Sequence, residues 1–288
     1  MRALFLLPLL LSGCAGETLY PGETDPQETD DTDVGDTEDT DPGFPSTYSD
    51  GKYKVSSLSI NAESDGIDVN GDGTPENNLP NALKLIDLAM PDFDLSRENL
   101  NAILADTILS GDLIYLIQAK HYQGELIMDW YPGEADFNGA VSPAARGYDS
   151  SGYPISRLRG DFSDERAFKV GPGEMTISML LLPPPQPFVD LPFELAHVQG
   201  TIWANECEGI IGGAIPADIL VEDIIEPLIP EEGVDTDGDG VINLSKEAIM
   251  TTVRNLAANE GVSDVDLGDG RRGVSSAMQF TALPTTWD

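Results

Sequence analysis

Cysteine, histidine and basic residues are all scarce in this chain of 288 residues. With two cysteines in total, it cannot form a fold that is stapled by several disulfides. Lys and Arg number 15 against 51 Asp and Glu, which gives a formal net charge of −36. Phosphate backbones and anionic membrane surfaces would repel such a chain, so nucleic acid is excluded as a partner.

Familiar catalytic motifs are also missing. The sequence has no Gly-x-Ser-x-Gly elbow, no His-Glu-x-x-His pair, no Walker loop and no dinucleotide fingerprint. His121 and His197 lie in strand-like stretches without a nearby Ser or Cys, which favours structural roles. Cys207 lies between Glu206 and Glu208, whose charges would raise the pKa of its thiol, so we expect a buried structural cysteine. The sequence therefore indicates a protein that is not an enzyme.

Residues 1–13 have the features of an export signal. Arg2 supplies a positive charge, and residues 3–11 are apolar apart from Pro8. A membrane-spanning helix needs about 20 apolar residues, and this run is much shorter. The segment is therefore predicted to be a cleaved signal peptide rather than a membrane span.

Leu11-Ser12-Gly13-Cys14 resembles the lipobox of bacterial lipoproteins. The resemblance implies cleavage before Cys14 and lipidation of its thiol, and two or three acyl chains make such a tether stable. Ala15 rather than Asp follows the cysteine, which by the same resemblance points to the outer membrane of a Gram-negative bacterium. We therefore expect an exported lipoprotein of the cell envelope, attached to the membrane through Cys14.

Residues 14–50 form an acidic tether rich in Thr and Asp. From Glu17 to Asp41 there is no Lys or Arg, and short acidic repeats such as Asp36-Thr37-Glu38-Asp39 dominate. Like charges this dense repel one another, and little apolar surface is present to offset the entropy of ordering. The segment is predicted to be a disordered spacer that holds the following domain away from the lipid surface.

Residues 51–288 are expected to form a single α+β domain. Alternating apolar and polar residues predict several strands of similar length without a strict βαβ order, which favours a mainly antiparallel sheet, sandwich or barrel-like. Turns are expected at residues 121–124 and 161–164, and the proline-rich stretch 181–192 is expected to be an extended connection. The predicted strands are residues 53–60, 113–117, 125–130, 174–182, 195–203 and 277–283.

Helical periodicity predicts three or four amphipathic helices packed on the sheet. Three sets of apolar residues recur at helical spacing, and a fourth helix is expected over residues 217–228. The three sets are Leu79, Leu83 and Ile86; Leu100, Ile103 and Leu104; and Ile249, Val253 and Leu256.

In the segment from residue 235, short acids stand at positions one, three and five and Gly240 stands at six, where the chain turns sharply, so the acids can converge on one hard cation. This pattern resembles the calcium loops of EF-hands, dockerins and thrombospondin type 3 repeats. Ile242 would tie the loop to the core, and a helix is expected from about Ser245. Lys246 replaces the acid of position twelve, so Glu247 is the candidate that completes the shell. The predicted ligands are Asp235, Asp237, Asp239, Val241 through its carbonyl, Asn243 and Glu247.

A second loop from residue 68 repeats the pattern. Gly73 stands at position six, Pro75 at eight and Leu79 at twelve, so this loop resembles the dockerin or thrombospondin type more than a regulatory EF-hand. The two loops are far apart in sequence, so we expect structural Ca²⁺ that stabilises the fold rather than a paired sensor. The predicted ligands are Asp68, Asn70, Asp72, Thr74 through its carbonyl, and Glu76.

Three interpretations of the domain follow. The first is a non-catalytic, calcium-stabilised binding or structural domain, with the membrane as a partner through the lipid anchor and a protein or glycan of the cell envelope as a further partner. The second is a carbohydrate-active or other hydrolase whose paired carboxylates are hidden among the many acids. The third is a barrel that carries an apolar ligand in a large cavity. The oligomeric state does not follow from the sequence.

Overall fold

The computed structural model describes residues 49–89, 94–163, 165–181, 188–235 and 240–287. All of them belong to one unit that extends from Pro45 to the last residue. Cys14, Asp237 and Asp239 lie outside the described residues, as does the whole segment 1–48. Over the described ranges, no helix combines the length and the apolar character that crossing a membrane would require.

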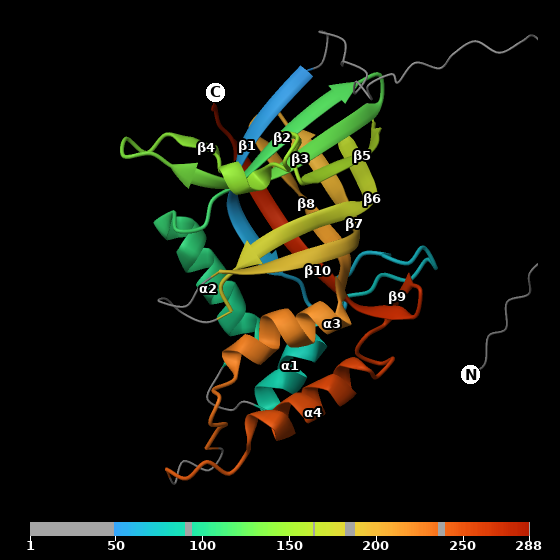
Figure 1. The fold of residues 1–288 in the computed structure, drawn as a ribbon. Coiled ribbons are helices and arrows are strands. Elements are labelled where there is room, and N and C mark those ends of the chain that lie inside the picture. The colour runs from blue at the N-terminus through green and yellow to red at the C-terminus, as the bar shows by residue number, and fades with distance from the viewer. Residues whose placement is uncertain (1–48, 90–93, 164, 182–187, 236–239, 288) are drawn as a thin grey trace, which may run out of the picture. The chain divides into compact units, whose positions relative to one another are not determined.

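Eight antiparallel strands form a closed barrel (Figure 1). Each strand pairs with the next one in the chain, and the last pairs with the first, so the topology is up-and-down. Two short strands, β4 (Val141–Pro143) and β9 (Val265–Gly268), extend β3 and β10 beyond the barrel. The barrel strands are β1 (Ser49–Ile60), β2 (Tyr115–Tyr122), β3 (Glu125–Ala135), β5 (Ser156–Phe162), β6 (Ala167–Met179), β7 (Val189–Trp203), β8 (Glu206–Pro216) and β10 (Arg271–Pro284).

The pairing of β1 with β10 closes the barrel. Its register runs from Tyr53 opposite Pro284 to Ile60 opposite Met278, with a β-bulge between Val55 and Ser57. A bulge adds one residue to one strand and so shifts the alternation of side chains. Because of this shift, Val55 and Leu58 are both buried although they are three positions apart.

The interior of the barrel is filled by apolar side chains. An eight-stranded barrel is just wide enough for side chains to fill it or for one small ligand to enter. Here Trp130 packs edge-on against Phe280 and against Tyr115, with ring centroids 5.0 and 6.3 Å apart. Cys207 is a free, fully buried thiol in the same core, as the sequence predicted, and burial together with the flanking glutamates raises its pKa to about 12.

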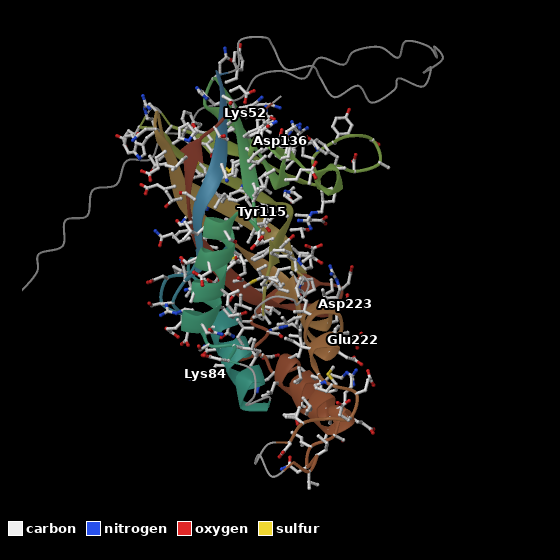
Figure 2. All side chains as sticks on the ribbon, turned by 90° about the vertical axis from the view of Figure 1, so that its left-hand side faces the viewer. Lys52, Lys84, Tyr115, Asp136, Glu222 and Asp223 are labelled. Atoms are coloured by element: carbon white, nitrogen blue, oxygen red, sulfur yellow. The ribbon has the colours of Figure 1, made fainter. Side chains whose placement is uncertain are left out.

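The helices cover one end of the barrel (Figure 1), and their buried residues belong to the same apolar core as the barrel interior. Figure 2 shows Tyr115 at the level of the barrel and Glu222 and Asp223 at the helical end. Ser96 and Ser245 accept backbone N–H bonds as N-caps of α2 and α4. The elements are α1 (Leu79–Ala89), α2 (Arg97–Ser110), α3 (Ala217–Ile219) with the π-helical Leu220–Ile225 and the 3₁₀ turn Glu226–Leu228, α4 (Lys246–Ala257), and a separate 3₁₀ turn, Ala145–Gly147.

The antiparallel, strand-rich class predicted from the sequence is confirmed, and the arrangement is a barrel rather than a sandwich. The expected set of amphipathic helices holds only in part, since residues 217–228 change helix type twice. The hairpin at 121–124 is tighter than predicted, because β2 continues to Tyr122. The predicted connection 181–192 is also too long, since Pro192 already pairs with Thr176 inside the sheet.

Candidate functional site

The Asp68 loop brings three of the predicted ligands together. One oxygen from each of Asp68, Asp72 and Glu76 lies within 4.8 Å of the others. Calcium takes roughly six to eight oxygen ligands, with carboxylates preferred. This group therefore has the charge and the donor atoms that a calcium ion requires.

Backbone amides hold these carboxylates in place. The amide of Gly73 donates to Oδ2 of Asp68 at 3.0 Å, and the amide of Thr74 donates to Oδ1 of Asp72 at 2.7 Å. Asn70 accepts from the amide of Asp72 at 2.9 Å. Gly73 has a φ of 88°, which a residue with a side chain rarely adopts. The loop thus has the sharp turn that the sequence predicted.

The loop is anchored on the outer surface of the barrel. Ile67 and Val69 are buried against Ala214 and Val265 in a small apolar cluster of their own. A Cβ atom on Gly212 of β8 would lie 1.8 Å from Cγ2 of Ile67, so only glycine lets the loop lie this close to the strand. The position of the cluster therefore depends on the packing of the barrel wall.

The side chain of Asn77 joins the end of the loop to β10 and to the two residues that follow β1. Its amide nitrogen donates to the carbonyl oxygens of Asn61 and Ala62 at 3.0 and 2.9 Å, and its oxygen accepts from the amide of Ala277 at 3.0 Å. Asn77 is only 4 % exposed, so these bonds are protected from water.

The pKa values of Asp72 and Glu76 are shifted in opposite directions. The amide of Thr74 holds the pKa of Asp72 below its ordinary value. Burial raises the pKa of Glu76, and the neighbouring charges of Asp72, Asp68 and Asp264 raise it further. Asp264 was not predicted to be a ligand, because the acidic stretch 264–270 breaks the spacing of a calcium loop and was interpreted as a turn. The cluster without a cation therefore carries unfavourable charge repulsion.

The Asp235 loop repeats one signature of the Asp68 loop. The amide of Gly240 donates to Oδ2 of Asp235 at 2.6 Å, which is the same bond from position six to position one. Asp237 and Asp239 fall outside the described residues, and Val241, Asn243 and Glu247 are exposed. Ile242 is 46 % exposed, so the prediction that it ties the loop to the core is wrong. Instead, Val234 and Leu244 form the bridge that precedes α4.

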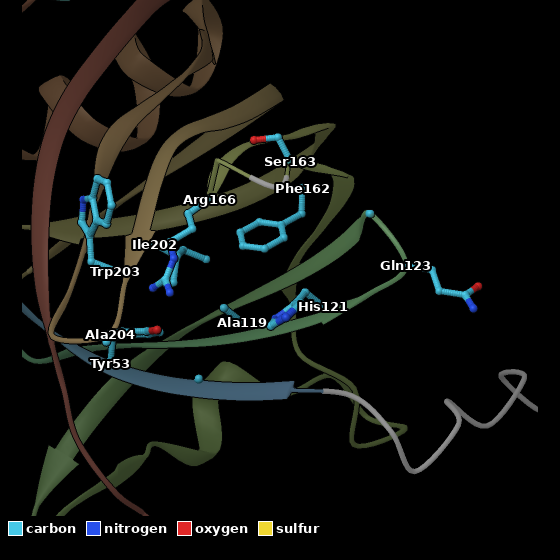
Figure 3. A pocket seen from close by; sticks show the side chains of 12 residues that line it. Tyr53, Ala119, His121, Gln123, Phe162, Ser163, Arg166, Ile202, Trp203 and Ala204 are labelled. Atoms are coloured by element: carbon cyan, nitrogen blue, oxygen red, sulfur yellow. The ribbon is translucent and has the colours of Figure 1, made fainter.

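A cavity of about 610 Å³ lies at the end of the barrel opposite the helices. We call it the mouth, and it is open to solvent. Figure 3 shows Arg166, Phe162 and His121 around a shared space, with Gln123 directed away from it. The lining residues come from strands β1, β2, β5 and β7 and from the turns β2–β3, β5–β6 and β7–β8. They are Gly51, Tyr53, Ala119, His121, Gln123, Gly124, Phe162, Ser163, Arg166, Ile202, Trp203 and Ala204.

The histidines and the buried carboxylate Asp129 do not assemble a catalytic group. His121 packs on Phe162 with centroids 4.8 Å apart, whereas burial lowers the pKa of His197 on another part of the barrel. Asp129 is fully buried, and its Oδ1 forms an ion pair with Nε of Arg157 at 2.7 Å. Its Oδ2 forms a second ion pair with Nζ of Lys120 at 3.7 Å. This arrangement is that of a structural ion-pair network across three strands.

Comparisons with protein-family models, with curated proteins and with solved structures give no match. The site therefore has to be interpreted from its own geometry.

We expect Glu76→Gln to stabilise the calcium-free protein at pH 7. The pKa of Glu76 is raised in the folded state, so the free energy of unfolding falls as the pH rises through that pKa, and a neutral side chain removes the loss. Urea unfolding in excess chelator should show a higher free energy of unfolding for the variant at pH 7. Near pH 4 the two proteins should differ little, because residue 76 is then mostly uncharged in both. The exposed Glu63→Gln is the control, and a Glu76→Gln protein that unfolds more easily at pH 7 would contradict the argument.

Proposed function

We propose that this chain is an exported lipoprotein whose barrel binds a small ligand at its mouth without catalysis. The mouth carries the proposal, because its cavity of about 610 Å³ is lined by aromatic and aliphatic side chains interspersed with polar ones. Binding pockets for small molecules commonly have volumes of roughly 300 to 1,000 Å³ and a few polar groups on apolar walls.

The packed interior favours the mouth over the inside of the barrel. Trp130, Tyr115, Phe193 and Phe280 occupy the space that an enclosed ligand would need, and each is at most 2 % exposed. A carrier of this design would hold its ligand at the open end, against Phe162, Ile202 and Trp203. Among the described residues that line the mouth there is no carboxylate, which favours binding over the hydrolase alternative.

The anchor and the calcium loops complete the proposal. Cys14 would carry the lipid and residues 14–50 would serve as the tether at the outer membrane, leaving the domain free to meet an envelope ligand, protein or glycan. Ca²⁺ at the Asp68 loop, and at the Asp235 loop, would stabilise the folded state by neutralising clustered carboxylates. The convergence of Asp68, Asp72 and Glu76 supports this metal role.

The mouth should bind Nile red, an uncharged apolar dye, with one site per chain. Ile202→Thr replaces the ethyl branch of this wall residue by a hydroxyl and should weaken the affinity roughly three- to tenfold. The matched control is Ile210→Thr. Ile210 is flanked in β8 by core-facing residues, so its side chain lies on the outer face of the barrel, outside the mouth lining. Fluorescence titration measures both, and equal affinities for the two variants would place the dye elsewhere.

Calcium should raise the melting temperature of the chelator-treated chain. If the dissociation constant is on the order of 10⁻⁴ to 10⁻³ M, about 10 mM calcium stabilises by roughly 1.4 to 2.7 kcal/mol, or about 3 to 11 °C. Asp68→Ala with Asp72→Ala should lose this rise, and Asp235→Ala tests the second loop separately.

The control for the calcium experiment is Asp136→Ala. Asp136 (Figure 2) is exposed and accepts backbone bonds in a turn, as Asp72 does, but it belongs to no described carboxylate cluster. Melting curves that do not respond to calcium in the unaltered chain would eliminate the metal role.

Cys14→Ser should release the protein from the membrane fraction when it is expressed in a Gram-negative host. The substitution removes the thiol that would carry the acyl chains. Cys207→Ser, which changes the buried thiol, should leave the protein with the membranes. Immunoblots of washed membranes and soluble fractions distinguish the two, and membrane retention of Cys14→Ser would argue against lipidation.

A further inference from the structure

The mouth has a charge character opposite to that of the chain. Acidic residues outnumber basic ones 51 to 15 overall, yet the described residues that line the mouth include Arg166 and His121 and no Asp or Glu. Strand alternation explains the segregation. Glu206 and Glu208 flank the inward, buried Cys207, so their side chains are directed to the outer face.

Two hydrogen-bond donors in the mouth have no partner among the described residues. Arg166 is exposed, and its guanidinium takes part in no ion pair or side-chain hydrogen bond there. Tyr53 is only 6 % exposed, and its hydroxyl likewise takes part in no side-chain hydrogen bond among these residues. These two donors are therefore available to a ligand.

Glycine places the Tyr53 ring in the floor of the mouth. A Cβ atom on Gly51 would lie 2.7 Å from the hydroxyl of Tyr53, so the phenol lies directly over the glycine. Arg166 is close enough to oppose the rise in the pKa of Tyr53 that burial and Cys207 cause. The two donors thus lie within electrostatic reach of one another.

Apolar surface surrounds these donors. Phe162 and Ile202 are half-buried, and Trp203 is 45 % exposed at the rim. The ring of His121 packs against Phe162 with the two planes tilted by 35° and adds to the aromatic wall. A ligand that meets both features needs one anionic group and an apolar body.

We propose that the mouth binds amphipathic carboxylates, with the carboxylate at Arg166 and the Tyr53 hydroxyl and the apolar body against Phe162, Ile202 and Trp203. This inference rests on the proposed function of the mouth as a ligand site and names the ligand class. A guanidinium and a phenol both donate to a carboxylate, and charge-assisted bonds of this kind are about twice as strong as neutral ones. Partial shielding by the walls limits competition from water.

The test uses 2-naphthoate and its uncharged analogue 2-naphthalenemethanol. With the full chain and calcium present, calorimetry should show that the unaltered protein binds 2-naphthoate at least tenfold more tightly than the alcohol. Arg166→Gln should remove that preference, weakening 2-naphthoate about tenfold or more while leaving the alcohol unchanged. Tyr53→Phe should weaken 2-naphthoate a few-fold, and decanoate should displace it.

Lys169→Gln is the control, because it removes one positive charge from β6, the strand that follows Arg166, at an exposed position outside the mouth lining. It should leave both affinities within about twofold of the unaltered chain, since Lys169 is solvent-exposed and salt screens exposed charges. Equal binding of the two probes, insensitive to Arg166→Gln, would overturn the carboxylate inference but keep the mouth as an apolar site. Absence of binding by both probes would overturn the inference and count against the proposed function itself. Melting curves confirm that each variant folds.

Discussion

Closure of the barrel by its first and last strands is the constraint on which the other features depend. The β1–β10 register turns eight strands into one continuous wall, so the inward side chains of every strand meet in a single core. The helices then seal one end of that core, and the other end becomes the mouth. The Asp68 loop depends on the same wall, since Ile67 lies over Gly212 and Asn77 bonds to Ala277 of β10.

Local patterns predicted several of the strands. The strand near Tyr53 alternates in polarity, whereas the one near Met128 is an apolar run that is buried on both faces; both were found at about the expected positions. β8 was missed because glycines interrupt its apolar pattern, yet Gly212 and Gly213 are there so that Ile67 and Phe193 can pack closely. β5 was missed because Arg157 and Arg159 gave it a charged character, although Arg157 pairs across the sheet with Asp129.

The two candidate sites differ in how much the sequence could reveal. The Asp68 loop is encoded within nine consecutive residues, so spacing alone indicated which carboxylates converge. The mouth is assembled from segments as distant as Gly51 and Trp203, and no local pattern connects them. Whether Arg166 lies inside or outside is decided by strand register, which sequence reasoning on separate segments could not supply.

Barrel closure also determines when the chain can fold. The hydroxyl of Ser56 bonds to the carbonyl of Thr281, a contact that spans 225 positions. Contacts of such long range form slowly, because a long loop must be closed before the pairing stabilises it. Until β10 has been synthesised, β1 and β8 are open strand edges, and Trp130 lacks its packing partner Phe280. Open edges and uncovered aromatic side chains promote association with other chains. A premature stop before Met278 would therefore produce an open, aggregation-prone sheet rather than a slightly shortened barrel.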